Sequence, residues 1–420
     1  MNAISGSKAR DCSGLWSVAL LSVISLCVVL PGWSQSPLPD GNGKEVIERA
    51  CAPCHGIERA TRARFTRQDW QSVVNLMVDF GATLTREEVP AVVEYLFRNF
   101  PGDPRPAGVL ISGNVEVSIK EWTLPTPGSR PHDPLAAPDG SVWYTGQVKN
   151  LLGRLDPKTG QIQEYRLKTP NSGPHGLVAD KQGNIWYTAN AGMHIGKLDP
   201  KTGESTEYRM PDPKARDPHT LIFDQKGTLW FTVQGGNMVG KLDPKTGEVK
   251  LVTAPTPNVR PYGIVVNSKG IPFFCEFGTN KLASIDPETM EIREYGLPNA
   301  GARPRRLAIS PDDAVWYTDF ARGFLGRYDP KTGQTKEWPS PSGPKSQPYG
   351  ISTVGNIIWY SESGVDKNTV VRFDPKTEKF QTWLIPSGGG VVRHMVTSPQ
   401  GVLWLALSGI NGIASVEIKN

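Results

Sequence analysis

Three residues near the N-terminus have the spacing that attaches haem c. Cys51 and Cys54 are separated by two residues, and His55 follows directly. In such a segment two thioethers fix the porphyrin, and the histidine supplies the proximal iron ligand. A Cys-x-x-Cys pair alone also fits a redox disulfide or half of a zinc site, but the sequence has no second pair to complete zinc and no surrounding βαβ pattern. The sequence therefore predicts covalent haem c.

Met77 is the predicted sixth ligand of that iron. It is the only methionine between residues 40 and 100, and it lies on a stretch of helical character, 68–80, that Gly81 ends. Thioether ligation raises the reduction potential of the haem and suits electron transfer. The alternative role for Met77 is a core methionine that faces the haem edge without binding the iron. The spacing of Trp70, Met77 and Gly81 resembles the small haem modules of quinohaemoprotein amine dehydrogenases. We therefore expect electron transfer to a redox partner protein.

The first 34 residues have the pattern of a signal peptide. Lys8 and Arg10 give a positive start, residues 15–30 are apolar, and residues 31–34 include small residues suited to cleavage. The alternative is an uncleaved anchor, but a membrane-spanning helix needs about 20 apolar residues. We expect cleavage, a periplasmic or secreted protein, and no stable membrane span afterwards.

Composition restricts the function further. The 420 residues carry a formal net charge of only +5 and no long run of Lys or Arg, so nucleic acid is not an expected partner. Cleavage would leave Cys51, Cys54 and Cys275, which cannot form a disulfide framework. Cys275 lies in an apolar stretch and is predicted to be a buried, inert thiol.

After a linker rich in Pro and Gly, residues 101–114, the chain repeats itself. A turn of sequence Asp-Pro-Lys-Thr-Gly recurs, and large aromatic residues follow one another every 43 to 45 positions, at Trp143, Trp186, Trp230, Phe273, Trp316, Trp359 and Trp404. Four short strands in such a period form a propeller blade. We predict a small all-α cytochrome c module over 40–100, followed by an all-β seven-bladed β-propeller over 115–420. The strand 115–124 should complete the last blade and close the ring.

One position in each repeat could form a functional ring. It lies 10 or 11 residues before the aromatic and is occupied by His132, His175, His219, Tyr262, Arg305, Tyr349 and His394. The first strand of a blade lines the central channel, so these side chains should surround its mouth and offer a small-molecule site. The alternative for His132 and His394 is a structural core histidine. Glu276, Asp319 and Glu362 follow the aromatic by three residues and are either cation ligands or ordinary hydrogen-bond partners.

The blade sequence, Pro-His/Tyr-Gly-Ile followed by Ile-Trp-Tyr-Thr and Ile-Gly-Lys-Leu-Asp-Pro, resembles the virginiamycin B lyase (streptogramin lyase) family. That family opens a cyclic depsipeptide lactone by Mg²⁺-assisted elimination, in which a histidine removes a proton α to a carbonyl. The resemblance implies His219 as acid or base, assisted by His175. It implies that Asp217 orients the site or binds Mg²⁺ and that Tyr262 contacts substrate. Asp217 replaces a glutamate of the family, and Gln234 replaces a metal-binding glutamate.

Three functions are compatible with these residues. The leading hypothesis is an exported haem c protein that carries out electron transfer, with the propeller binding a ligand, partner or substrate. The second is a carbon–oxygen lyase of the streptogramin B type. The third is a haem-linked oxidoreductase with catalysis at the ring and haem as acceptor. Elimination involves no net oxidation or reduction and does not explain a covalent haem, so the first hypothesis is favoured.

Overall fold

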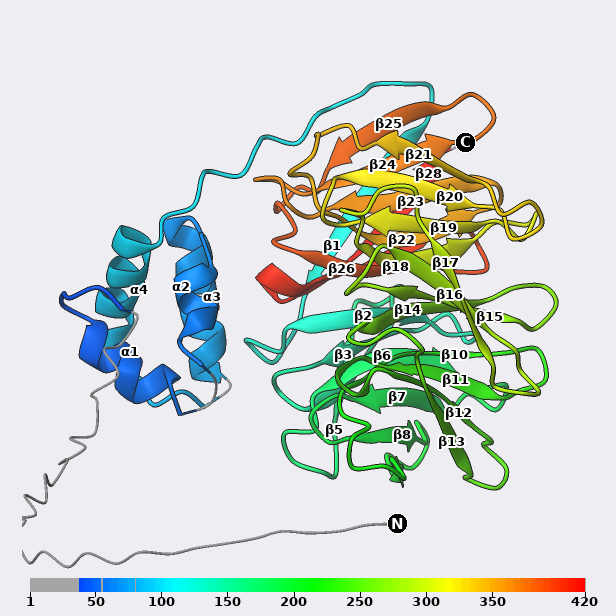
Figure 1. Ribbon diagram of the computed structural model, residues 1–420, viewed down its shortest axis with the longest axis horizontal. Coiled ribbons are helices and arrows are strands. Elements are labelled where there is room, and N and C mark those ends of the chain that lie inside the picture. The colour runs from blue at the N-terminus through cyan, green and yellow to red at the C-terminus, as the bar shows by residue number, and fades with distance from the viewer. Residues whose placement is uncertain (1–37, 54–55, 80, 420) are drawn as a thin grey trace, which may run out of the picture.

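The computed structural model consists of a helical module and a β-propeller joined by an extended linker (Figure 1). It describes residues 38–53, 56–79 and 81–419. The predicted signal peptide, residues 1–34, lies outside this range, and so do Cys54 and His55. No helix in the described ranges is long and apolar enough to cross a bilayer.

The helical module contains four short helices. These are α1 (Lys44–Cys51), α2 (Glu58–Arg62), α3 (Arg67–Asp79) and α4 (Glu88–Asn99). The helix predicted over 68–80 is therefore present as α3. The helices bury a common apolar core that includes Ile47, Trp70, Val74, Val92, Val93, Leu96 and Phe100. Whether this module is a cytochrome stays a prediction.

Threonines begin the two long helices of the module. The backbone N–H of Asp69 donates to Thr66 Oγ1 at 3.1 Å, which caps α3. At α4 the backbone N–H of Glu88 donates to Thr85 Oγ1 at 3.3 Å, while the carboxylate of Glu88 accepts from the N–H of Thr85 at 2.9 Å. This reciprocal pair is a capping box, and it fixes where α4 starts.

The propeller has seven sheets of four strands each. The first strands are β2 (Pro131–Ala136), β6 (Pro174–Ala179), β10 (Pro218–Phe223), β14 (Pro261–Val266), β18 (Pro304–Ile309), β22 (Pro348–Val354) and β26 (Val392–Thr397). The second strands are β3 (Val142–Gly146), β7 (Ile185–Ala189), β11 (Leu229–Val233), β15 (Pro272–Glu276), β19 (Val315–Asp319), β23 (Ile357–Glu362) and β27 (Leu403–Leu407).

The third and fourth strands lie further from the axis. The third strands are β4 (Leu151–Leu155), β8 (His194–Leu198), β12 (Met238–Leu242), β16 (Lys281–Ile285), β20 (Phe324–Tyr328), β24 (Thr369–Asp374) and β28 (Gly412–Lys419). The fourth strands are β5 (Ile162–Arg166), β9 (Ser205–Arg209), β13 (Val249–Thr253), β17 (Ile292–Gly296), β21 (Thr335–Pro339), β25 (Lys379–Leu384) and β1 (Glu116–Thr123).

The N-terminal strand closes the ring. β1 pairs antiparallel with β28 along its whole length, from Glu116 opposite Lys419 to Thr123 opposite Gly412. The last blade therefore takes three strands from the C-terminus and one from the start of the propeller. Both the predicted blade count and the predicted closing strand are confirmed. Closure removes the exposed sheet edge that the last blade would otherwise present.

A glycine in the third strand makes room for a tyrosine of the second strand. A Cβ atom at Gly153 would lie only 1.9 Å from the ring of Tyr144, and one at Gly196 only 2.0 Å from Tyr187. The ring crosses the glycine so that the hydroxyl of Tyr144 donates to Glu164 in the fourth strand at 2.9 Å. The same close approach explains the glycine that recurs at the centre of the third strand in four blades, and in the first blade the hydrogen bond of Tyr144 holds three strands together.

The linker joins the helical module to one face of the propeller. Arg105 Nη2 pairs with Asp69 of α3 at 2.5 Å, and its Nη1 donates to the carbonyl of Gly390 at 3.4 Å. The backbone N–H of Val109 donates to Ser342 Oγ at 2.9 Å. Gly390 and Ser342 lie in the loops that lead into the first strands β26 and β22.

All loops that lead into first strands open on the same face, because the first strands of a propeller run in one direction. We call this face the entry face. The short helix η2 (Ser408–Ile410) also lies on it, where the hydroxyl of Ser408 donates to the carbonyl of Pro131 at the start of β2. Figure 1 shows the helical module on the side of the propeller from which η2 projects.

A substitution in the closing strand β1 should destabilise the propeller more than the same substitution in a matched outer strand. Ile119 in β1 and Ile162 in β5 are equally half-buried on fourth strands. We expect Ile119→Asp to lower the free energy of unfolding by about 3 kcal/mol and Ile162→Asp by about 1 kcal/mol, because only β1 joins the two ends of the ring. Urea denaturation followed by tryptophan fluorescence measures both. Equal losses would contradict this role for β1.

Candidate functional site

A bulge at the start of each first strand turns two residues out of the ladder. In β6, for example, the pairing with β7 skips from Pro174 to Leu177, and each of the other six first strands shows a shift at the same place. The first skipped residues form what we call the mouth ring: His132, His175, His219, Tyr262, Arg305, Tyr349 and Arg393. The second skipped residues form the inner layer: Asp133, Gly176, Thr220, Gly263, Arg306, Gly350 and His394.

The seventh position of the mouth ring is Arg393. The sequence pattern predicts His394 there and is wrong at this position. Val392 pairs with Leu407, which corresponds to the pairing of Pro348 with Glu362 in the sixth blade. The first hairpin of the sixth blade is one residue shorter, so its ring residue lies 10 positions before the aromatic, whereas in the seventh blade, as in the first five, the distance is 11. The sequence prediction applied the distance of 10 to the seventh blade and so reached His394. His394 therefore belongs to the inner layer.

Hydrogen bonds from the preceding blade position the mouth ring. Thr145 Oγ1 in β3 donates to the carbonyl of His175 at 2.9 Å, and Thr188 Oγ1 in β7 donates to that of His219 at 2.7 Å. Cys275 has the same role, since its Sγ donates to the carbonyl of Arg305 at 2.9 Å. The predicted burial of Cys275 is confirmed, and burial raises the pKa of its thiol to about 12, while its inertness stays a prediction. The Thr of the repeated Trp-Tyr-Thr motif thus fixes the ring residue of the next blade.

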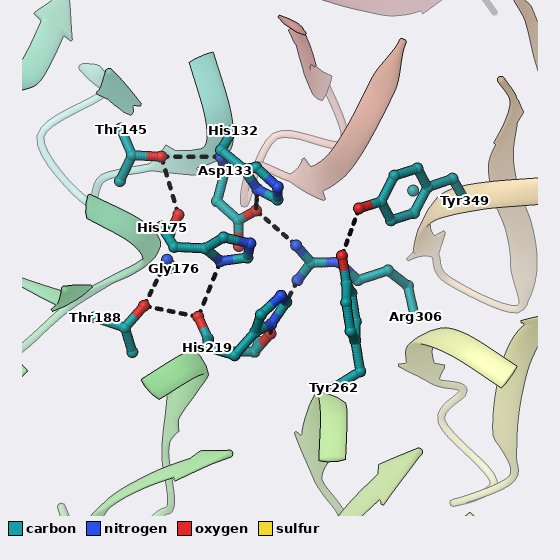
Figure 2. Close-up of polar contacts among 12 residues, drawn as sticks. His132, Asp133, Thr145, His175, Gly176, Thr188, His219, Tyr262, Arg306 and Tyr349 are labelled. Carbon is teal, nitrogen blue, oxygen red and sulfur yellow. Dashed lines mark hydrogen bonds and ion pairs between the residues drawn. The ribbon is translucent and has the colours of Figure 1, made fainter. Parts of the chain in front are cut away.

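Three histidines and a tyrosine of the mouth ring lie in a row (Figure 2), each ring tilted by 39° to 48° against the next. The ring centroids of His132 and His175 are 3.6 Å apart, those of His175 and His219 are 3.8 Å apart, and those of His219 and Tyr262 are 3.9 Å apart. His175 Nδ1 is 3.0 Å from the carbonyl of His219. The structure therefore brings together three of the four residues predicted for a lyase site, although it does not test their role.

Below this row an ion pair crosses the channel. Arg306 of β18 extends to Asp133 of β2, with 2.7 Å between Nη2 and Oδ1, and its Nη1 donates to Thr220 Oγ1 at 3.3 Å. Arg306 is only 1% exposed. Asp133 also lies 2.8 Å from His132 Nδ1. Figure 2 shows the guanidinium among the histidine rings.

The histidines around the channel are neutral at neutral pH. Burial lowers the pKa of His132, His175 and His219 well below the ordinary value, and the cation of Arg306 lowers each further. A neutral imidazole can accept a proton, so these side chains are in the protonation state that a general base requires.

Two tyrosines of the mouth ring share a hydrogen bond. The hydroxyl oxygens of Tyr262 and Tyr349 are 2.5 Å apart. Burial raises the pKa of Tyr349, but Arg305, Arg393, Arg306 and the hydroxyl of Tyr262 outweigh burial and bring it down to about 8. Burial raises the pKa of Tyr262, its partner. Tyr349 is therefore the member of the pair that ionises first.

Asp217 does not join the histidines. It lies just before β10, and its Oδ1 accepts from Asn190 Nδ2 at 2.6 Å. Burial raises its pKa to about 6, although the cation of Arg260 opposes this. Gln234 contributes its backbone N–H to the carbonyl of Asp217 at 2.9 Å, and its amide carries no charge.

The donors at this mouth do not fit a magnesium ion. Within the described residues, the one group with the spacing of metal ligands is His132, Asp133 and His175. Arg306 already compensates the carboxylate of this group. Mg²⁺ prefers carboxylate oxygens, so a guanidinium on the only carboxylate excludes a favourable site. We derive no step through a metal.

The three carboxylates predicted on second strands form hydrogen bonds with residues of their own blade or of the loop that leads into it. Glu362 accepts from Ser340 Oγ at 2.6 Å and from Thr369 Oγ1 at 2.6 Å. Asp319 accepts from the backbone N–H of Arg303 at 3.0 Å. Glu276 contacts Thr279 at 3.3 Å. Of the two roles predicted for these carboxylates, cation ligands or hydrogen-bond partners, the contacts are those of hydrogen-bond partners.

The helical module encloses an apolar cavity of about 420 Å³. Cys51, at the end of α1, and Met77, on α3, both line it, together with apolar side chains of all four helices and the turns between them. Cys54 and His55 lie outside the described residues. The cavity is of the size that small-molecule and cofactor sites have.

Sequence reasoning missed Arg306, Asp133 and Arg393. A signal was present, because the residue after the ring position is glycine in three blades and is replaced by a charged side chain at Asp133 and Arg306. The sequence does not show that the first and fifth blades face each other across the channel, where Asp133 and Arg306 meet.

Comparisons with known proteins agree with the propeller geometry. The family described as the virginiamycin B lyase family matches residues 111–285 and 273–420. A streptogramin B lyase structure superimposes with a TM-score of 0.67 at 27% identity, covering 72% of this chain and 98% of that one. Virginiamycin B lyase from Staphylococcus aureus gives a TM-score of 0.66 at 24% identity, covering 72% and 99%. A catalytically inactive form of that enzyme with quinupristin gives 0.66 at 23%, with the same coverage. No curated protein matches the chain.

The tyrosine pair gives a direct test of the charge at the mouth ring. The difference in tyrosinate absorbance between the native protein and Tyr349→Phe should titrate with a midpoint near 8. Arg305→Gln should raise that midpoint by about 1 to 3 pH units, because it removes a cation that stabilises the tyrosinate. Arg293→Gln, on an outer strand, is the matched control and should not move it. An unchanged midpoint in Arg305→Gln would contradict the assigned electrostatics.

Proposed function

The chain belongs to the virginiamycin B lyase family, and we propose that it is an exported haem c protein that transfers electrons and binds a small-molecule ligand in its propeller. Membership of the family explains the propeller but does not explain the Cys-x-x-Cys-His segment. The haem part of the proposal therefore rests on the helical module, and the ligand part rests on the mouth ring.

One observation carries the haem proposal. Cys51, the first cysteine of the attachment segment, and Met77, the predicted sixth ligand, line the same apolar cavity although 26 positions separate them. This donor set fits haem c: Cys51 and Cys54 would form the thioethers, and His55 and Met77 would ligate the iron. Apolar walls favour the neutral macrocycle and exclude water. The bound group would supply one-electron chemistry.

The linker supports a connection between the two parts. Arg105 pairs with Asp69 of the helical module and also donates to Gly390 on the entry face, where the mouth ring opens. A ligand at the mouth ring and a haem in the module would then lie on the same side of the propeller. The third hypothesis, a haem-linked oxidoreductase with catalysis at the ring, requires this arrangement.

Spectroscopy tests the haem proposal. The full chain should be exported to the periplasm of a bacterial host that has a haem c maturation system. It should then show haem c bands in a reduced-minus-oxidised spectrum. Cys51→Ser together with Cys54→Ser should abolish covalent attachment. Met77→Ala should keep the haem but lose the thioether-to-iron absorption and lower the reduction potential, because a soft ligand to ferrous iron is removed.

Met210→Ala, a half-buried methionine of the propeller, is the matched control and should change none of these spectra. Absence of haem c bands in the maturation-competent host would refute the proposal. Bands that Met77→Ala leaves unchanged would refute the assignment of the sixth ligand alone.

A second candidate function is lactone opening by elimination. Family membership favours it, together with the contact of the neutral His175, His219 and Tyr262 rings. In this reaction His219 would accept the carbon-bound proton, the electron pair of the C–H bond would form a double bond, and the carbon–oxygen bond would break with its electrons on oxygen. The uncharged state of His219 suits that step.

Quinupristin, which accompanies the inactive S. aureus enzyme, is the appropriate probe. If the lyase operates, incubation with Mg²⁺ opens the ring without adding the mass of water, and His219→Ala slows opening by about 100-fold or more. His194→Ala, a buried histidine outside the mouth ring, is the control and should keep the activity. No opening, or opening that survives His219→Ala, rejects this function while the haem proposal stands.

A further inference from the structure

Cations gather at the mouth of the channel without matching anions. Arg130 precedes β2, and Arg305 and Arg393 occupy two positions of the mouth ring. They come from the first, fifth and seventh blades. Burial lowers the pKa of Arg130 to about 9, and the cations of Arg393 and Arg305 contribute to this. We call these three residues the arginine cluster.

The arginine cluster has few partners among the described residues. Arg130 Nη1 donates to Gln147 Oε1 at 2.7 Å, and Arg305 Nη2 donates to the hydroxyl of Tyr262 at 3.4 Å. The Nε atoms of Arg305 and Arg393 are buried and have no hydrogen-bond partner. No carboxylate in the described ranges forms an ion pair with any of the three. Unmet guanidinium donors of this kind are costly unless a ligand satisfies them.

Nearby acids do not neutralise the cluster. Asp133 is already paired with Arg306, so that ion pair adds no net negative charge. Burial raises the pKa of Asp217 to about 6, and its Oδ1 is held by Asn190. The mouth-ring histidines are neutral and offer no negative charge. The mouth therefore carries a net positive charge that points to an anionic ligand.

Aromatic rings hold one guanidinium in place. Arg305 Cζ lies 3.8 Å from the ring centroid of Tyr349, 4.1 Å from that of Phe320 and 4.8 Å from that of Phe277. Stacking on aromatic faces fixes the plane of the guanidinium without using its N–H donors. Phe277 and Phe320 also contact each other, with centroids 6.1 Å apart, and they give the mouth an apolar wall beside the charge.

We propose that the mouth of the propeller binds an organic carboxylate whose anionic group is held by the arginine cluster and whose apolar body lies against Phe277 and Phe320. A planar guanidinium offers two parallel N–H donors that match the two carboxylate oxygens. The inference deepens the ligand-binding half of the proposed function and is independent of the haem. It replaces the cation that the family resemblance implied at this mouth with an anion.

Calorimetry with simple probes tests this proposal on the full chain. In a low-chloride buffer, benzoate should bind with a one-site isotherm, and benzamide, which has the same shape without the charge, should not. Arg393→Gln should weaken benzoate binding by about tenfold or more, because a charge-assisted hydrogen bond is lost. Arg293→Gln on β17 is the matched control and should bind as the native protein does. Arg130→Gln replaces Arg393→Gln if the latter does not fold.

A local readout distinguishes the mouth from other anion sites. Bound benzoate should raise the pKa of Tyr349, because the anion offsets the cations that lower it. Equal affinity for benzoate and benzamide, inorganic phosphate binding more tightly than benzoate, or benzoate binding that leaves the Tyr349 titration unchanged would each overturn the proposal. Loss of haem in any variant bears only on the electron-transfer proposal.

Discussion

The buried ion pair between Arg306 and Asp133 is the constraint on which the channel depends. A charge at 1% exposure is costly, and removing either partner of such a pair typically costs about 3 to 5 kcal/mol, because the other charge stays buried. The pair also links β18 to β2 across the axis, so it ties together blades that are 173 positions apart. Its geometry requires both blades to be in register, which the closing strand β1 secures from outside.

The same ion pair divides the channel into two environments. On the far side is a cavity of about 650 Å³, lined mostly by apolar residues of the first strands and ending at Arg306 and His394. On the entry face are the stacked imidazoles, the tyrosine pair and the arginine cluster. Burial keeps the histidines neutral, and the positive charge of Arg306 lowers their pKa values further. The same guanidinium leaves Asp133 no unpaired charge for a metal.

The fold was largely predictable from the sequence because its information is local. The aromatic spacing, the Asp-Pro turns and the Gly153-type glycines each encode a contact within one blade, and repetition made the period visible. The closing strand was predictable since β1 repeats the pattern of β5. The mouth ring was predictable except in the seventh blade, where the 10-residue distance of the shorter sixth hairpin was applied and gave His394 in place of Arg393.

The site itself was less predictable because it depends on contacts across the channel. Stacking of His175 on His219 follows from adjacent blades, and the repeat implies it. The approach of Arg306 to Asp133 depends on the diameter of the ring and on side-chain length, which no motif records. Asp217 stands in sequence where the family has a glutamate, yet its neighbours Asn190 and Arg260 keep it apart from the histidines. Motif order alone could not distinguish a cation site from an anion site.

The central claim about the channel is that Arg306 compensates Asp133, the one carboxylate among its candidate metal ligands, and leaves no magnesium site there. Titrating Mg²⁺ into the full chain by calorimetry tests it most directly, with Asp217→Asn as the companion variant. The account predicts no saturable binding at the mouth and identical traces for both proteins. One-site Mg²⁺ binding in the native chain that disappears in Asp217→Asn would contradict it.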